Sequence, residues 1–175
     1  MGDISSRHSV AVLVSIGAFA LTPFPATAAS AAGARIFLQK IYSHYPTPPD
    51  RKGFIPTGPV ARQVFDPGMV ALLREDERLA DGEVGAIDAD PLCDCQDDSG
   101  LKITIEDVRL AGPASAKARV TLQFGAPAAP ATERLQISLA VVAGQWRIHD
   151  IGSRATPSLR AYLLHENHAN ANGRR

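Results

Sequence analysis

The sequence predicts an α+β fold: a curved four-stranded antiparallel sheet covered by two N-terminal helices and one C-terminal helix. Three observations predict it. Apolar residues recur at helical spacing before residue 81, alternate with polar residues across 101–151, and return to helical spacing after residue 156. Helices on either side of a run of strands are typical of an α+β domain, in which they pack on one face of the sheet.

The first 28 residues are predicted to be a cleavable signal peptide. Arg7 precedes an apolar run from Val10 to Leu21, and the small residues Ala26 and Ala28 follow at the positions that a signal peptidase recognises. The apolar run is shorter than the roughly 20 residues that cross a bilayer. We therefore expect a periplasmic bacterial protein with no membrane insertion after signal cleavage.

The rest of the chain is predicted to be one domain, residues 29–166, followed by a disordered tail. The tail, 167–175 (NHANANGRR), is polar and terminal. The chain carries 18 basic and 18 acidic residues and no basic stripe. This balance argues against nucleic acid and against an anionic membrane surface as partners.

Local signals place the N-terminal helices. The spacing predicts one helix from Ala34 to Tyr45, followed by a proline-rich loop from Pro46 to Gln63. A second helix is expected to begin with Asp66 as its cap and Pro67 in its first turn, and to fade within the charged stretch 74–78.

The first pair of strands predicts a bulge. Alternation in 101–105 gives way to the opposite phase at Val108 and Leu110, whereas Ala116 to Phe124 keeps one phase. One extra residue at Glu106–Asp107 would explain the slip, with Ile105 then facing Leu122. A bulge bends the strand that carries it, and the predicted curvature rests on this slip.

The second pair of strands predicts a hairpin through a two-residue turn at Ala143-Gly144. Val141 then faces Trp146 and Leu139 faces Ile148, which matches the apolar faces. The same register places Asp150 opposite Ile137 on the core side. A last helix is expected over 157–165, with Thr156 as its cap.

Several blocks together resemble a known family. The most specific are Asp90-Pro91 with Gln96-Asp97, and Trp146 to Ile148 with Asp150-Ile151; the wider blocks are FLQKIYSHY, VFDPGMVALLRED, DADPLCDCQD, WRIHDI and SLRAYLL. The chain resembles the exported bacterial domain-of-unknown-function family 3828, which is related to NTF2-like and cystatin-like folds. The resemblance implies a bent, cone-shaped sheet with a pocket at its open end, and it implies no reaction.

The candidate site residues follow from the acidic loop and the last strand. Asp150 on an apolar face either ties the strand end to the loop before the last helix, which we favour, or faces a cavity. Asp90, Gln96 and Asp97 are candidates for the other half of the same polar network, and Trp146 is a candidate pocket residue.

The acidic loop also invites a metal hypothesis. It carries a cluster of carboxylates, which hard cations such as Ca²⁺ prefer: Asp88, Asp90, Asp94, Asp97 and Asp98. An EF-hand loop that starts at Asp94 would need glycine at its sixth position and glutamate at its twelfth. Gly100 stands one residue later than the sixth position and Ile105 stands at the twelfth, so the EF-hand spacing fails. The alternative is a solvated loop whose side chains cap turns.

Cys93 and Cys95 are the only cysteines. Three interpretations are open: a strained disulfide, a thiolate pair for a soft metal, or two thiols without a role. Export to an oxidising compartment favours the disulfide.

The histidines give weaker signals. His165 and His168 have a spacing that suits a divalent metal, but solvated side chains are the alternative. His149 and Asp150 are neighbours that strand alternation turns to opposite faces, so they are not predicted to form a dyad. The sequence assigns no catalytic residue, no metal and no cofactor.

Three function classes follow, and none is decided by a motif. We expect a non-enzymatic periplasmic binding or accessory module, with a small ligand or a protein as partner, in a pocket between sheet and helices. The alternatives are a small enzyme that uses pocket carboxylates and an immunity-type inhibitor that binds a protein. A raised carboxyl pKa in a deep polar pocket would favour the enzyme, and an exposed apolar patch would favour the inhibitor.

Overall fold

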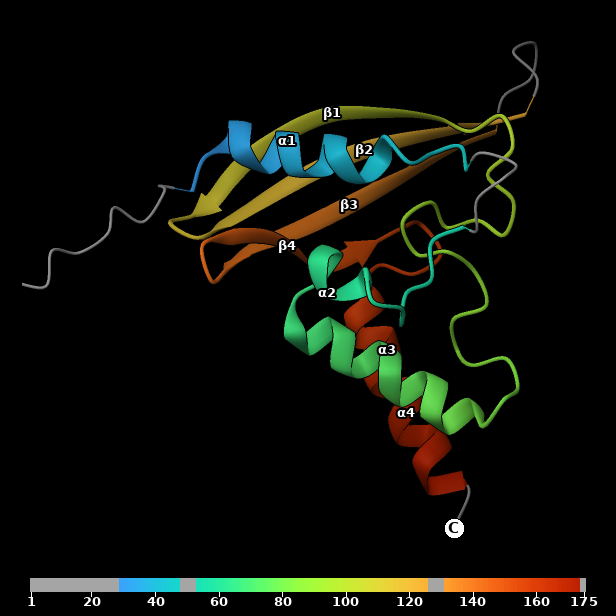
Figure 1. Cartoon of the computed structure of the whole chain (residues 1–175). Helices are drawn as coiled ribbons and strands as arrows, with labels where there is room; N and C mark the ends of the chain where they lie inside the picture. The colour runs from blue at the N-terminus through green and yellow to red at the C-terminus, as the bar shows by residue number, and fades with distance from the viewer. Residues whose placement is uncertain (1–28, 48–52, 126–130, 174–175) are drawn as a thin grey trace, which may run out of the picture.

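The computed structural model describes residues 29–47, 53–125 and 131–173 (Figure 1). The predicted signal peptide lies outside these residues. The strands form one antiparallel sheet in the order β1-β2-β3-β4, which confirms the predicted α+β class with a four-stranded antiparallel sheet. The elements are α1 (Ala31–Tyr42), α2 (Ala61–Val64), α3 (Pro67–Ala80), β1 (Lys102–Gly112), β2 (Ser115–Phe124), β3 (Ala131–Val142), β4 (Gln145–Gly152) and α4 (Leu159–Gly173).

Helix α1 lies three residues earlier than predicted at both ends. The Ser30 hydroxyl accepts a hydrogen bond from Gly33 N at 3.0 Å and so begins the helix before Ala34. The helix ends at Tyr42, and the chain then turns, with His44 N donating to Ile41 O at 3.2 Å.

The end of the loop predicted between residues 46 and 63 forms part of the one-turn helix α2, so three helices of the described residues precede the sheet where two were predicted. Ala61 and Val64 on α2 are buried. A single turn with two apolar residues is too short to show helical periodicity in the sequence.

The predicted start of α3 is confirmed. Asp66 Oδ1 accepts a hydrogen bond from Met69 N at 2.7 Å, and Pro67 stands in the first turn. The helix does not fade in the charged stretch but continues to Ala80, because Leu79 on its inner side is buried in the protein.

The first bulge lies where the sequence predicts it, but the predicted pairing beyond it is wrong. The register shifts between Ile105 and Asp107, so Glu106 alone is the extra residue. Ile105 consequently faces Val120 and not Leu122. Pairing Ile105 with Leu122 would have needed the extra residue on β2, whereas the extra residue lies on β1.

The second hairpin pairs as predicted only in its first half. Val141 faces Trp146 and Leu139 faces Ile148, but the register then shifts. Asp150 faces Ser138, and Ile151 takes the predicted place opposite Ile137. Asp150 is therefore not on the core side, because a second bulge at His149 reverses the alternation.

Helix α4 corrects two predictions about the C-terminus. It spans Leu159–Gly173, and the Ser158 hydroxyl accepts from Ala161 N at 3.1 Å in place of the predicted Thr156 cap. The predicted disordered tail is wrong for residues 167–173. Asn167 is buried and its Nδ2 donates to Leu72 O at 3.0 Å, which fastens the end of α4 to α3.

The helices meet the sheet in two groups (Figure 1). Helix α1 lies along β1, whereas α3 and α4 pack together against β4. Phe65 forms a parallel bridge with Ile148, and Asp66 N donates to Ile148 O at 2.9 Å, so this segment covers the β4 edge. Within the described part of the chain, no helix has the length and apolarity to cross a membrane.

Candidate functional site

A cleft of about 820 Å³ lies between α1, the segment 53–64 and the β3–β4 turn. Helix α1 contacts mainly β1 and only a small part of β4, against which α3 and α4 pack. Its walls carry mainly apolar side chains, with polar groups at separate points: Phe37, Lys40, Ile41, His44, Tyr45, Thr47, Phe54, Ile55, Val60, Gln63, Val64, Leu92, Gln145, Trp146 and Arg147.

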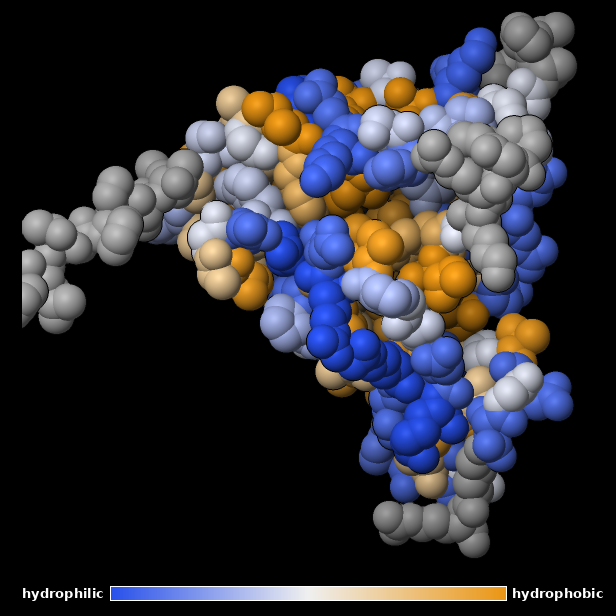
Figure 2. Space-filling view, viewed as in Figure 1, coloured by the Kyte–Doolittle hydropathy of each residue, from blue (hydrophilic) through white to orange (hydrophobic). Residues whose placement is uncertain are grey.

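The apolar walls are built from all three elements. Phe54 packs edge-on against the buried Phe65, with 6.0 Å between the ring centroids. Trp146 is the second residue of β4, and its ring lies close to Gly33, where an added Cβ would stand 3.2 Å from Trp146 Nε1. Figure 2 shows hydrophobic surface gathered between α1 and α2. An apolar concavity of this kind is typical of a small-molecule site.

At one end of the cleft the wall is polar, because Tyr45 lines the cleft and Asp90 lies behind it. The Tyr45 hydroxyl is hydrogen-bonded to Asp90 Oδ2, and Asp90 Oδ1 accepts from Leu92 N at 2.8 Å. Burial raises the pKa of Asp90 to about 6, against these hydrogen bonds, which lower it. Burial, followed by the Asp90 charge, raises the pKa of Tyr45, so the hydroxyl stays protonated and donates.

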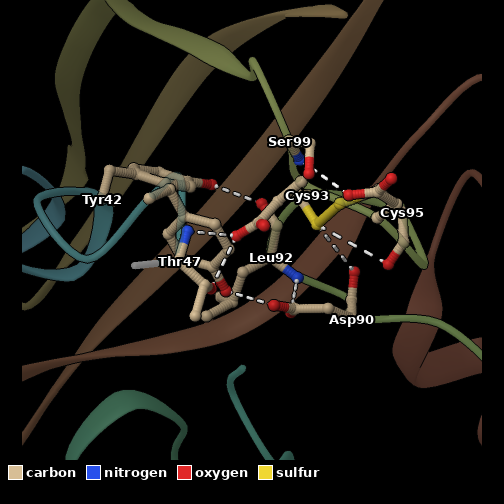
Figure 3. Close-up of a disulfide and its surroundings, with 10 residues drawn as sticks. Tyr42, Thr47, Asp90, Leu92, Cys93, Cys95 and Ser99 are labelled. Carbon is tan, nitrogen blue, oxygen red and sulfur yellow. Dashed lines mark hydrogen bonds between the residues drawn. A yellow bond between two sulfur atoms is a disulfide. The ribbon is translucent and has the colours of Figure 1, made fainter. Parts of the chain in front are cut away.

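The loop behind this wall carries a disulfide between Cys93 and Cys95 (Figure 3). Asp90 N donates to Cys95 O at 2.9 Å, which makes residues 90–95 a tight turn. The turn is fastened to the end of α1, since the Tyr42 hydroxyl donates to Leu92 O at 3.1 Å. The disulfide closes residues 93–95 within this turn, and the Asp90–Cys95 backbone hydrogen bond joins Asp90 to it.

A second fastening holds the same loop. Asp98 Oδ2 accepts from Thr47 N at 2.7 Å and from the Thr47 hydroxyl at 2.6 Å. Thr47 lines the cleft, so the wall and the acidic loop form one connected structure.

The structure separates the residues that the sequence analysis grouped as one network. Trp146 lines the cleft, and Asp90 lies behind Tyr45 at its wall. Gln96 and Asp97 are exposed: Gln96 Nε2 donates to Asp88 Oδ2 at 3.3 Å, and Asp97 Oδ1 accepts from Ser99 N at 2.8 Å. No hydrogen bond of the described residues joins this group to Asp150, so the predicted shared network is wrong.

Asp150 anchors the start of α4. Its Oδ1 accepts from Arg160 N at 2.9 Å, and its Oδ2 accepts from the Ser158 hydroxyl at 2.6 Å. The favoured interpretation, a tie between the end of β4 and the loop before the last helix, describes these contacts, although the side chain reaches them from the face opposite to the predicted one.

Sequence reasoning missed a cluster around Asp66. His149 Nδ1 lies 2.6 Å from Asp66 Oδ2, and Arg160 Nη2 donates to Asp66 Oδ1 at 2.6 Å. Burial opposes ionisation of Asp66, but the hydrogen bonds from Met69 N, His149 and Arg160 outweigh it and hold its pKa below the usual range. The three residues lie too far apart in sequence for a local pattern to reveal them.

The metal hypotheses gain no support from the geometry. Across residues 29–47, 53–125 and 131–173, no three His, Cys, Asp or Glu side chains are placed to hold a metal ion. His165 and His168 are exposed, and His168 Nε2 lies 3.0 Å from Asn172 Nδ2. Asp88, Asp90 and Asp97 instead accept hydrogen bonds from their own loop, as the alternative interpretation expected, whereas Asp98 accepts from Thr47.

Comparison with known proteins adds no assignment. No family model, no curated protein and no solved structure matches this chain.

Proposed function

We propose that this protein is an exported, non-enzymatic binding module with an NTF2-like cone, and that its ligand occupies the cleft between α1, the segment 53–64 and β4. The observation that carries the proposal is the cleft itself. Its volume of about 820 Å³ falls in the range of small-molecule sites. The mainly apolar lining with a few separate polar groups is the usual composition of such sites.

Two further features support this proposal. Ile55 and Val60 remain about half exposed at the cleft although they are apolar. A ligand in the cleft would remove this apolar surface from water. The Cys93–Cys95 disulfide suits an oxidising compartment and hence an exported protein.

A second candidate function, acid–base catalysis, is favoured by one observation. The pKa of Asp90, about 6, falls where a carboxyl can exchange protons near neutral pH. Both Asp90 oxygens already accept hydrogen bonds, however, and Tyr45 stands between the carboxyl and the cleft. Asp90 is therefore better placed to support the wall of the cleft than to exchange a proton with a substrate, and we favour binding over catalysis.

The test uses Trp146, the only tryptophan in the chain and a residue of the cleft wall. Titration with N-phenyl-1-naphthylamine, a neutral apolar dye, is expected to quench Trp146 emission and to saturate at one site. Ile55→Asp should weaken binding about tenfold or more, because it places a charge in the apolar wall.

The matched control is Val84→Asp. Val84 is 75 % exposed and lies outside the cleft, whereas Ile55 is 53 % exposed and lines it. The control should bind the dye as the parent does. Absence of saturable quenching in the parent, or equal losses in both variants, would contradict the proposed binding site. Recovery of a chemically altered ligand after incubation would instead favour the enzyme.

A further inference from the structure

We propose that the cleft takes a single-chain amphiphile with an anionic headgroup, with the chain against the apolar walls and the headgroup between Lys40 and Arg147. This inference rests on the proposed binding function and names the chemical class of its ligand. It is carried by the distribution of charge around the cleft.

The described residues that line the cleft include three bases and no acid. Lys40 stands on α1, His44 stands in the turn that follows the helix, and Arg147 stands on β4 at the other wall. The whole chain is balanced, with 18 basic and 18 acidic residues. A lining with bases alone is thus a local departure from the composition of the protein, and it favours an anion.

Hydrogen bonds hold the Arg147 guanidinium in place without pairing it with an acidic side chain. Its Nε donates to Arg62 O at 3.0 Å, Nη1 to Trp146 O at 2.7 Å, and Nη2 to Gln145 Oε1 at 2.8 Å. All three acceptors are neutral, and Arg147 forms no ion pair with the described residues. A guanidinium has five N–H groups, so two remain for a carboxylate or a similar anion.

Lys40 supplies the matching group on the opposite wall. It lies in the last turn of α1, one residue before the buried Ile41 and three after Phe37, which lines the cleft. Its exposed side chain can lay its methylene stem along the apolar wall and keep the ammonium at the rim. Like Arg147, Lys40 forms no ion pair with the described residues.

The remaining lining selects the rest of the ligand. Phe37, Phe54, Val64 and Leu92 offer carbon surface that suits a hydrocarbon chain. The polar side chains of the remaining lining stand at separate points: Tyr45, Thr47, Gln63 and Gln145. The site is also a concave volume with apolar walls, not a flat face, which favours a small amphiphile over a folded protein.

The decisive comparison uses two probes with the same chain and opposite charge. Dodecanoate and dodecyltrimethylammonium are titrated into the full mature chain, and binding is followed by Trp146 emission. Dodecanoate is expected to bind at least about tenfold more tightly, since only the anion gains charged hydrogen bonds. The difference should shrink with added salt, because the two bases lie near solvent.

Charge reversal at the rim locates the headgroup. Lys40→Glu should weaken dodecanoate about tenfold and should strengthen dodecyltrimethylammonium, with its folding checked by urea unfolding. Arg147→Gln should weaken dodecanoate in the same way, and urea unfolding likewise checks its folding. The control is Lys117→Glu, on an exposed β2 position outside the cleft, which should change neither probe.

The possible failures are distinguishable. If the neutral dye binds but the two charged probes bind alike, the anionic ligand is wrong and the proposed binding function stands. Failure of all three probes to bind the folded protein would overturn both. Co-purification of a stoichiometric peptide in native mass spectrometry, displaced by none of the probes, would also overturn the amphiphile proposal.

Discussion

Buried or half-buried carboxylates in this protein bind backbone amides at the ends of elements. Asp66 accepts from Met69 N, Asp150 from Arg160 N, and Asp90 from Leu92 N. Asp76 does the same for the loop after α3, where its Oδ1 accepts from Ala86 N at 2.8 Å. These acids therefore stabilise local chain geometry, and the lining of the cleft is left without an acidic group.

Asp150 is the residue whose role is most directly testable. Asp150→Ala should lower the free energy of unfolding by about 1–3 kcal/mol, because it leaves Arg160 N and the Ser158 hydroxyl without their acceptor. Asp150→Asn keeps one acceptor oxygen and should cost clearly less. Urea midpoints of the two variants measure the difference. An Ala variant as stable as the parent would show that the anchor contributes nothing.

Local signals could be predicted from the sequence at the residue scale, and distant pairs could not. Asp66 as a helix cap follows from its position before Pro67. Its contacts with His149 and Arg160, 83 and 94 residues away, have no signature in the spacing. The Tyr45–Asp90 pair spans 45 residues and was missed for the same reason.

At the scale of elements, the strands show which bulges can be predicted from the apolar periodicity of the sequence. The slip at Glu106 could be predicted because the apolar phase changes on both sides of it. The bulge at His149 could not be predicted, since Trp146, Ile148 and Asp150 stand at every second position, as in a regular strand. Only the apolar Ile151 departs from this alternation. A polar Asp150 in an apolar phase was the available signal, and it was read as a buried acid.

Helix α4 provides a prediction at this scale. Deletion of residues 167–175 should lower the free energy of unfolding by about 1–2 kcal/mol, because it removes the buried Asn167 and its hydrogen bond to Leu72 O. Deletion of 172–175, in which Asn172 and Gly173 are exposed, should have little effect. Thermal or urea unfolding of both truncations checks this. Equal stability of the two would mean that the last turns of α4 add nothing to the packing against α3.

At the scale of the whole molecule, two carboxyls give the stability opposite dependences on pH. The pKa of Asp66 is lowered in the folded state, so its contribution is present above pH 4 and is lost as the pH falls further. The pKa of Asp90 is raised from 3.8 to about 6, so the folded state favours its neutral form. Its contribution is therefore largest below pH 4 and is lost as the pH rises through 6.

The cleft wall should consequently be most stable in mild acid, and one substitution isolates the cause. In the parent, the Asp90 contribution to the free energy of unfolding should fall between pH 4 and pH 6. Asp90→Asn, which keeps a neutral group beside Tyr45, should remove that decline and make the protein relatively more stable at pH 7. Asp97→Asn, in the same loop but exposed, is the control and should leave the decline in place. Urea unfolding at each pH measures all three proteins. If Asp90→Asn retains the parent slope between pH 4 and 6, the burial of Asp90 is not its source, and the polar wall of the cleft would have to be charged at neutral pH without cost to the fold.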